Sequence, residues 1–353
     1  MIGPCLASLV GQVDEIIVLD TGSTDYTREM AASYGAKVVQ SDWNDNFSDM
    51  RNISLQYAKS EYIFVIDADE RAPENARERM KWFTQHFPDA LGRVRIRSPW
   101  RDNSGEIQTV TSHSTRFFPR SSEIFYSGVI HEQVMDASDR RQRCDINMTL
   151  WHQGYELSTT KMIEKTKRNI VLLKSGLREQ PENGYYWYQL GKSYEALKEW
   201  GRAAECYEAG LVFGDAAASY YPELLIAYLY NAKASMDQDK VWSLLKYALE
   251  RYPDLPDLYF LAGKALIDFS ISNLDLIRKS FETCILLGEK GEKYTTVEGV
   301  GSYLAMYNLG VFYESQADWD RALEMYRQAV SYGYKRANNA AERILSFQRA
   351  QMS

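Results

Sequence analysis

The sequence predicts an α/β domain at residues 1–157, followed by an all-α domain of repeated helical hairpins at residues 158–353. Three observations support this division. The chain of 353 residues exceeds the usual extent of a single hydrophobic core. Short apolar runs alternate with helical stretches in the first part, which is typical of parallel βαβ units. After about residue 158 the strand-like runs disappear, and helical patterns recur at a roughly constant spacing.

The composition is that of an ordinary globular chain, with 45% hydrophobic and 25% charged residues. A net charge of −7 argues against a nucleic-acid partner, because contacts to phosphates require a basic surface. The four cysteines form no Cys-x-x-Cys pair, so we expect reduced thiols rather than a zinc site or disulfides. No apolar run approaches the ~20 residues that span a bilayer, and no signal peptide is recognisable. We therefore expect a cytoplasmic protein without a transmembrane segment.

The first domain begins with a strand–helix–strand–helix–strand pattern. Residues 16–19, 38–39 and 62–66 are predicted as strands of a parallel sheet, with helices at 24–34 and 48–59 between them. The first and third of these strands are expected to be buried on both faces. Ser23 or Thr24 is expected to cap the first of these helices, and Gly35 to end it. Residues 93–97 and 144–151 instead alternate polar and apolar side chains, which predicts antiparallel or mixed strands with one polar face.

Acidic residues follow two of these strands. Asp20 comes after the first run, and Asp67-Ala68-Asp69-Glu70 after the third. Ligands of open α/β sheets bind beyond the carboxyl ends of the strands, so both clusters are expected at the binding edge. If the chain is extended there, Asp67 and Asp69 point the same way and can hold a divalent cation together with diphosphate oxygens. Asp20 is expected to accept hydrogen bonds from a base or ribose; the alternative is a chance acidic pair and a plain helix cap.

The second domain shows a repeated pattern of aromatic, Leu-Gly, Tyr, Ala and aromatic residues. This pattern matches tetratricopeptide spacing at Trp187, Leu190, Gly191, Tyr194, Ala203 and Tyr207. It recurs at Leu309, Gly310, Tyr313, Ala322 and Tyr326. Weaker versions lie at residues 231–247 and 263–281. A small residue in one helix lets its partner approach closely, which favours stacked hairpins over the alternative of an irregular helical bundle.

Several segments of the first domain together resemble one family. They are VDEIIVLDTGSTD, DNFSDMRNISLQYAKSEYIFVIDADE, RFFPR, SGVIHEQV and LWHQGY. In combination they resemble bacterial family 2 glycosyltransferases that have a tetratricopeptide tail. The resemblance implies a GT-A fold with a Rossmann-like mixed sheet. It also implies transfer of a sugar from a nucleotide-diphosphate donor, expected to be UDP-linked, with Mn²⁺ or Mg²⁺. It also implies that Asp20 faces the nucleobase, Arg51 the nucleotide, Asp67 the ribose and Asp69 the metal.

Such a reaction needs a cation on the departing diphosphate and a base on the opposite face of the sugar. A single displacement inverts the anomeric carbon. Glu132 follows an expected short strand at 128–130 and is our candidate base for an acceptor hydroxyl or thiol. His152 ends the strand predicted at 144–151 and is our candidate for a further metal ligand or diphosphate contact, a role that His131 could take instead. The alternative for either histidine is a structural, hydrogen-bonded side chain.

The resemblance begins late in the family pattern. Family members have one more apolar strand, and an Asn-Glu pair, before the helix that here includes residues 5–9. That strand lies between the strand ending at Asp20 and the strand ending at Asp67. We therefore expect the sheet to lack its first strand, with a truncated start as the favoured reason. The alternatives are that another segment fills the gap or that the domain is inactive.

Two other functions fit parts of this pattern. A catalytically dead or truncated transferase domain could serve as a tetratricopeptide interaction scaffold. A nucleotidyltransferase would normally have a Gly-rich phosphate loop near its N-terminus, and the sequence has none. For the enzyme, we expect a nucleotide-sugar donor and a peptide or protein acceptor bound by the concave repeats.

Overall fold

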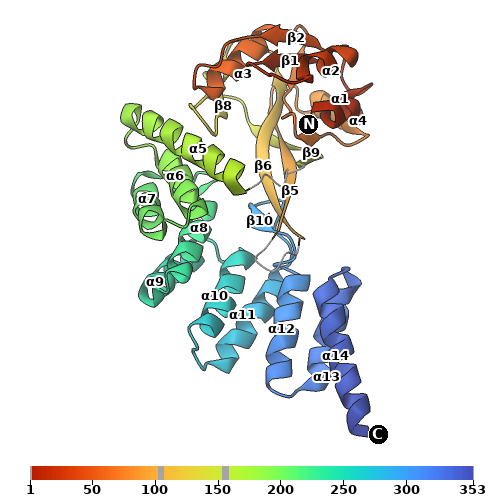
Figure 1. Ribbon diagram of the computed structural model, residues 1–353, viewed down its shortest axis with the longest axis vertical. Coiled ribbons are helices and arrows are strands. Elements are labelled where there is room, and N and C mark those ends of the chain that lie inside the picture. The colour runs from red at the N-terminus through yellow and green to blue at the C-terminus, as the bar shows by residue number, and fades with distance from the viewer. Residues whose placement is uncertain (1, 102–106, 153–158, 353) are drawn as a thin grey trace. The chain divides into compact units, whose positions relative to one another are not determined.

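The computed structural model describes residues 2–101, 107–152 and 159–352, and it divides into two compact units, Met1–Lys198 and Glu199–Ser353. Figure 1 shows strands and helices in the first unit and stacked helices in the second. The helices α5 (Thr159–Glu179) and α6 (Gly184–Ala196) pack within the first unit. The domain boundary predicted between residues 157 and 158 lies outside the described residues and stays a prediction.

The first unit contains, besides α5 and α6, four helices and nine strands among its described residues. The helices are α1 (Ile2–Leu9), α2 (Thr27–Ser33), α3 (Phe47–Gln56) and α4 (Ala76–His86). The strands are β1 (Ile17–Asp20), β2 (Lys37–Gln40), β3 (Tyr62–Phe64), β4 (Glu70–Arg71), β5 (Leu91–Arg101), β6 (Ile107–Pro119), β7 (Ile124–Ser127), β8 (Gln133–Asp136) and β9 (Arg143–His152). The predicted α/β class is confirmed, but residues 128–130 form a turn and not the short strand expected there.

The strands form a mixed arrangement. β1 pairs in parallel with β2, as the first βαβ pattern predicts. β5 pairs antiparallel with β6 and parallel with β9, which confirms the mixed sheet expected for residues 93–152. β9 continues to β4, and β3 is antiparallel to β6. β7 and β8 form a separate hairpin.

Helix α4 covers one face of this sheet. Its buried Met80 and Phe83 pack in one core with Val94 of β5 and with Ile146 and Met148 of β9. The apolar positions of β5 and β9 alternate with polar ones, because successive side chains of a strand point to opposite faces. The predicted polar face of these strands is thus the face away from α4.

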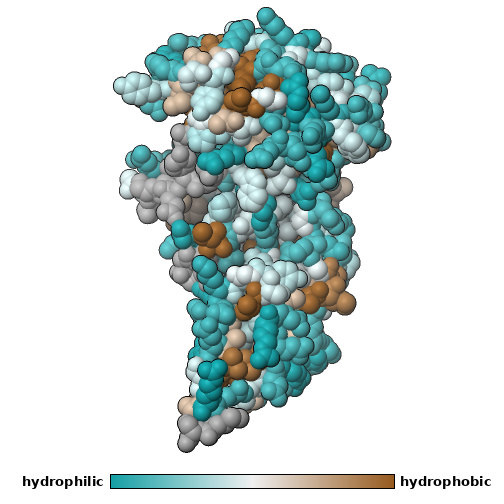
Figure 2. Space-filling view, turned by 90° about the vertical axis from the view of Figure 1, so that its right-hand side faces the viewer, coloured by the Kyte–Doolittle hydropathy of each residue, from teal (hydrophilic) through white to brown (hydrophobic). Residues whose placement is uncertain are grey.

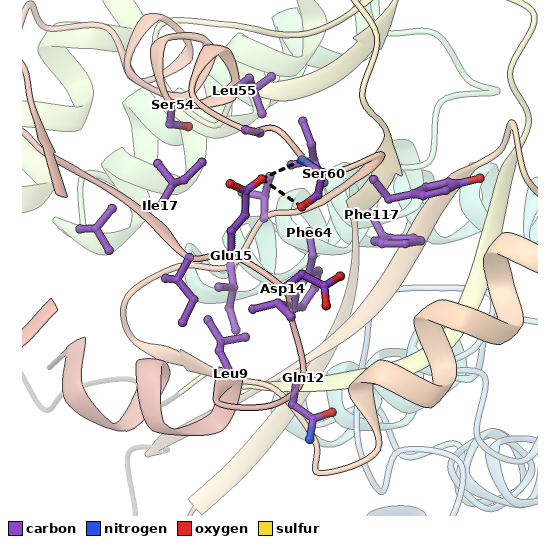
Figure 3. A pocket seen from close by; sticks show the side chains of 18 of the residues that line it. Leu9, Gln12, Asp14, Glu15, Ile17, Ser54, Leu55, Ser60, Phe64 and Phe117 are labelled. Atoms are coloured by element: carbon purple, nitrogen blue, oxygen red, sulfur yellow. Dashed lines mark hydrogen bonds between the residues drawn. The ribbon is translucent and has the colours of Figure 1, made fainter. Parts of the chain in front are cut away.

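A gap separates β1 from β3. In the part of the chain that the structure describes, β1 pairs only with β2, and β3 only with β6. Between them lies a cavity of about 590 Å³. Figure 3 shows Leu9, Ile17, Leu55 and Phe64, from four different elements, around it. The gap stands where the sequence predicts that the first strand is absent. It leaves β1 and β3 largely half-buried, so our prediction that both strands are buried on both faces is wrong.

One side chain links the two sides of this cavity at its end. Glu15 precedes β1, and its Oε1 accepts hydrogen bonds from Ser60 N (2.8 Å) and Ser60 Oγ (3.0 Å), just before β3 (Figure 3). The same oxygen accepts from Lys59 N at 2.6 Å. At the height of β1, β2 and α3, a hydrophobic area interrupts the otherwise mostly hydrophilic face in Figure 2. The gap is therefore bordered by apolar side chains and closed at one end by a polar link.

The second unit consists of helical hairpins. Its described helices are α7 (Trp200–Phe213), α8 (Tyr221–Ala234), α9 (Gln238–Arg251), α10 (Pro256–Asp268), α11 (Leu274–Leu287), α12 (Tyr303–Ser315), α13 (Trp319–Ser331) and α14 (Lys335–Met352), with the short strand β10 (Thr296–Val297) between α11 and α12. Side chains at the N-caps of α9, α11 and α13 accept a backbone hydrogen bond from the first turn: Asp237, Asn273 and Asp318. These caps set where each second helix of a hairpin begins.

The repeat residues pack as their spacing predicts. Gly310 of α12 lies against the buried ring of Tyr326 in α13, so a Cβ on this glycine would come within 2.6 Å of the ring. Gly263 of α10 faces Phe281 of α11 in the same way, at 2.8 Å. The prediction of stacked hairpins with close approach at a small residue is confirmed. No helix among the described residues is long and apolar enough to cross a membrane.

Candidate nucleotide and metal site

The acidic segment 67–70 is a tight turn. Glu70 N donates to Asp67 O at 2.9 Å, and Asp67 N donates to the Glu70 carboxylate at 2.9 Å. Because the chain turns here, the two-residue alternation of an extended strand does not apply. Asp67 and Asp69 take different partners, so our expectation that they point the same way as an extended pair is wrong.

Asp67 lies between two arginines. Arg51 Nη2 of α3 is 2.7 Å from Oδ1, and Arg116 Nη2 of β6 is 2.6 Å from Oδ2. Burial by itself would raise the pKa of Asp67, but the charges of Arg116 and Arg51 outweigh it and hold this pKa well below its ordinary value. Asp67 is therefore a carboxylate at any physiological pH, with lone pairs left for a ligand hydroxyl.

Arg116 is a site residue that the sequence interpretation did not single out. Its side chain is buried, and Nη2 also lies 3.0 Å from the carboxylate of buried Glu70. Burial raises the pKa of Glu70. The available signal was a charged residue followed directly by Phe117 and Phe118, both of which are buried. A charge inside an apolar strand requires a buried partner, and here Asp67 and Glu70 provide it.

Arg51 also connects Asp67 to Glu132. Arg51 Nε donates to Glu132 Oε1, and its guanidinium lies 5.3 Å from the centre of the Tyr126 ring. Despite burial, the carboxylates of Asp67 and Glu132 and the neighbouring Tyr126 raise the pKa of Arg51. One cation thus joins the predicted nucleotide-binding residue to the candidate base, which lie 65 positions apart along the chain.

Glu132 follows the turn at 128–131. Gly128 has φ +115°, and His131 has φ +54°, a left-handed conformation that histidine adopts more readily than most side chains. Burial, followed by the charges of Lys192 and Lys165, lowers the pKa of His131 to about 4. His131 is therefore neutral at physiological pH, and its recorded surroundings are cationic rather than acidic.

Asp69 and His152 form a pair beside this network. His152 Nε2 lies 3.1 Å from Asp69 Oδ2, and His152 Nδ1 lies 3.2 Å from Ser98 Oγ. The hydrogen bond from His152 lowers the pKa of Asp69, and the same bond raises the pKa of His152. Within residues 2–101, 107–152 and 159–352, no three His, Cys, Asp or Glu side chains are grouped to hold a metal by themselves. The pair offers two protein ligands, and of the two candidate histidines it is His152 that lies next to Asp69.

Asp20 holds the turn after β1. Its buried carboxylate accepts from Ser23 N at 3.1 Å and lies 3.7 Å from Arg28 Nε. Helix α2 begins at Thr27, and Tyr26 at its N-cap makes no side-chain cap bond. The prediction that Ser23 or Thr24 caps this helix is wrong. The Asp20 carboxylate, which we expected to bind only a base or ribose, also fixes the turn. Gly35, with φ +77°, ends the helix as predicted.

The two strand ends share one cavity. Thr21, which follows Asp20, lines the cavity between β1 and β3 together with Arg51 and Asp67. The carboxyl ends of β1 and β3 therefore border a common space, as expected for the binding edge of an α/β sheet.

Comparison with known families assigns the N-terminal part of the chain. Residues 1–133 match the model of glycosyl transferase family 2. The N-terminal part of the chain is a family 2 glycosyltransferase domain. Residues 305–337 match the tetratricopeptide repeat model. Five predicted site residues lie inside the first match: Asp20, Arg51, Asp67, Asp69 and Glu132. His152 lies outside it.

One curated relative is named for its repeats and another for its activity. A TPR repeat-containing protein of Synechococcus elongatus is 33% identical over 195 residues, which is 53% of this chain and 47% of that protein. The SPbeta prophage-derived glycosyltransferase SunS of Bacillus subtilis is 28% identical over 200 residues, which is 55% of this chain and 46% of SunS. The chain spans about half the length of these curated relatives. Among solved structures, the crystal structure of MamA aligns with 52% of this chain and 99% of its own, at 19% identity and a TM-score of 0.41.

Proposed function

We propose that the glycosyltransferase domain takes a UDP-linked sugar, in the presence of Mn²⁺ or Mg²⁺, and transfers it with inversion to a peptide or protein acceptor presented by the repeats. The observation that supports this most is the position of Arg51. It binds Asp67 at 2.7 Å and also binds Glu132, while Asp67 and Arg51 both line the cavity at the end of β1. A nucleotide contact and a base would then lie on the two sides of one guanidinium.

The nucleotide half of the site is pre-organised by ion pairs. Arg116 and Arg51 hold both oxygens of Asp67, which fixes the carboxylate as an acceptor for ribose hydroxyls. Asp20, fixed by Ser23 N, would contact the base. Because these side chains are held by packing and charge, little conformational entropy is lost when a nucleotide binds.

Glu132 is the proposed base. Arg51 binds its Oε1, so Oε2 is the oxygen that would accept the proton of the acceptor hydroxyl or thiol. The sugar would lie between this oxygen and the diphosphate. Attack from the side opposite to the leaving group makes a single displacement, which inverts the anomeric configuration. Analysis of the anomeric product by NMR tests this step, and a retained configuration would contradict it.

The residues fit a divalent cation with incomplete protein coordination. Asp69 and His152 would hold the ion, and diphosphate oxygens and water would fill the remaining positions. When bound, such an ion stabilises the charge that develops on the leaving diphosphate.

Calorimetric titration with UDP, with and without Mn²⁺, tests the proposal on the full chain. We expect binding that depends on Mn²⁺, because the protein offers the diphosphate a cation through Asp69. Asp69→Ala should weaken the Mn²⁺-dependent binding at least about tenfold, since even indirect partners of metal ligands contribute that much. Asp320→Ala, in the first turn of α13, is the control and should bind UDP normally.

A second function remains tied to one observation. The match of residues 305–337 to the tetratricopeptide repeat model fits an interaction scaffold whose transferase domain is inactive. The titration separates the two, because a scaffold would bind UDP under neither condition. That outcome would overturn the proposed enzyme.

A further inference from the structure

The turn that precedes Glu132 is held by the helical hairpin α5–α6. We propose that this hairpin belongs to the transferase site, because it fixes the turn, and that Tyr186 is a positioning residue for Glu132. The inference rests on the proposed function of Glu132. It concerns a side chain of the helical region, beyond the residues that match the transferase family.

The backbone of Val129 is bound from two directions. Val129 N donates to Tyr186 Oη of α6 at 3.1 Å, and Val129 O accepts from Phe47 N at the start of α3 at 2.9 Å. Helix α3 also contains Arg51, which binds Glu132. The turn is therefore fixed between the helix that holds the arginine and the hairpin that holds the tyrosine.

The contact between Tyr186 and Val129 is closely packed. Tyr186 is 4% exposed, and a Cβ on Gly176 of α5 would lie 2.6 Å from its ring and 3.1 Å from Val129 Cγ2. A Cβ on Gly128 would lie 3.2 Å from Tyr186 Oη. The two glycines thus let α5, the tyrosine and the turn meet without intervening atoms. Asn183 caps α6 by accepting from Tyr186 N at 3.0 Å, which fixes the backbone from which the ring projects.

The conformation of the turn explains why it needs such support. Both Gly128 and His131 have positive φ, and left-handed conformations of residues other than glycine persist where surrounding contacts determine them. Both helices of the hairpin reach this segment: Tyr186 of α6 accepts from Val129 N, and Gly176 of α5 packs against the Val129 side chain. Glu132 follows the segment 128–131 directly.

Tyr186 acts on Glu132 through the backbone. If Val129 N loses its acceptor, the turn gains freedom and Glu132 no longer points at a fixed position. Base catalysis depends on that position, whereas nucleotide binding through Asp20 and Asp67 does not. A loss confined to turnover, with nucleotide affinity preserved, is the signature that distinguishes positioning from general structural support.

The test compares Tyr186→Phe with the unchanged full chain by two measurements. Hydrogen–deuterium exchange with mass spectrometry follows peptides spanning 127–133, and UDP release from UDP-sugars, with water as acceptor and Mn²⁺ present, follows turnover. We expect exchange at this segment to rise up to about tenfold, as for loss of one hydrogen bond. We expect kcat to fall about tenfold, with KM and the Kd for UDP within about twofold.

A second variant and two controls keep the result interpretable. Gly176→Ala, which pushes a Cβ into Tyr186 and Val129, should reproduce both effects. Gly201→Ala, a helical glycine with nothing within 4 Å of its Cβ position, should change neither. Tyr326→Phe removes a buried tyrosine hydroxyl that donates to Glu314 at 2.6 Å in the second unit, and it should also change neither.

Unchanged exchange at 127–133 in Tyr186→Phe would overturn the inference by itself, whether or not the enzyme is active. Raised exchange with unchanged kcat would also overturn it, because the turn would then not control the base. A wild-type chain that binds no UDP and releases none from UDP-sugars would overturn the proposed function. In that case the exchange data would still show whether Tyr186 fixes the turn.

Discussion

The two units of the molecule differ in where their ion pairs lie. In the first unit, Arg116 and Glu70 are 8% and 3% exposed, and their ion pair joins strands that are distant in the sequence. In the second unit, a typical pair such as Arg321–Asp318 lies within one turn of a helix, with the arginine side chain 60% exposed. The core of the second unit is instead formed by buried rings and small residues. The comparison teaches that the repeat unit is stabilised by local packing, whereas the site depends on contacts between remote segments.

Removal of a buried charge should have the largest effect and tests this difference most directly. Arg116→Met leaves Asp67 and Glu70 without their shared cation, and we expect it to lower the free energy of unfolding of the first unit by about 3–5 kcal/mol. Arg321→Ala, the matched surface change, should cost no more than about 1 kcal/mol. Urea unfolding, followed separately for the two units, measures both. A similar cost for the two variants would contradict the contrast.

Acid should change the contributions of two buried groups, one in each unit, in opposite directions. The folded pKa of His131 is lowered to about 4 by burial, below its ordinary value of 6.5. Its contribution to stability is therefore complete above pH 6.5 and is lost as the pH falls through 4, which amounts to about 3 kcal/mol. His131→Asn, which tolerates a positive φ, should flatten this dependence in the first unit.

The second unit provides the counterpart. Asp257 at the start of α10 is 5% exposed and accepts from Thr296 Oγ1, and burial raises its pKa from 3.8 to about 6. A raised carboxyl pKa stabilises the protonated folded form, so this contribution is present below pH 3.8 and is lost as the pH rises through 6, again about 3 kcal/mol. Asp257→Asn should remove it. The measurement is the stability difference between each variant and the wild type at pH 4 and pH 7, and the assignment of these two groups would fail if that difference did not change with pH in opposite directions for the two variants.

A smaller loss of stability is expected for a change in the repeat core. Gly310→Ala places a Cβ 2.6 Å from the Tyr326 ring, and we expect this overpacking to destabilise the second unit by about 1–3 kcal/mol. Gly201→Ala has open space around its Cβ and should be neutral or stabilise its helix by up to about 1 kcal/mol. Thermal unfolding of the two variants measures the difference. Equal melting temperatures of the two variants would show that the close approach at Gly310 does not limit the size of the side chain at this position.

The sequence predicted the parts of the fold that depend on local spacing. The repeat residues Gly310 and Tyr326, the parallel pair β1–β2 and the stop at Gly35 follow from patterns within a few tens of residues, and the structure has them. The gap between β1 and β3 was expected from the family resemblance alone, because family members have one more strand at that place. The predicted start of α2 was wrong by three residues, because Asp20 accepts from Ser23 N and holds this segment in a turn, and the helix begins only at Thr27.

The site was harder to predict, because its partners meet only in three dimensions. The extended geometry assumed for Asp67 and Asp69 is wrong, since the hydrogen bond from Glu70 N to Asp67 O turns the chain. Arg116 was overlooked because the two phenylalanines that follow it indicate burial, but the sequence gives no sign of which carboxylate the arginine meets. The proximity of His152 to Asp69 also depends on the β4–β9 pairing, which no sequence motif specifies. The roles assigned to these residues stay predictions.

The gap between β1 and β3 also limits what could enter it. Two of its borders are the edges of β1 and β3, and no strand among the described residues pairs with these edges. Their N–H and C=O groups need hydrogen-bond partners, and a hydrocarbon in this space would leave them unsatisfied, at a cost of roughly 1–3 kcal/mol for each. In spite of its apolar side chains, the space therefore disfavours oils and detergent tails and favours molecules that carry amides of their own.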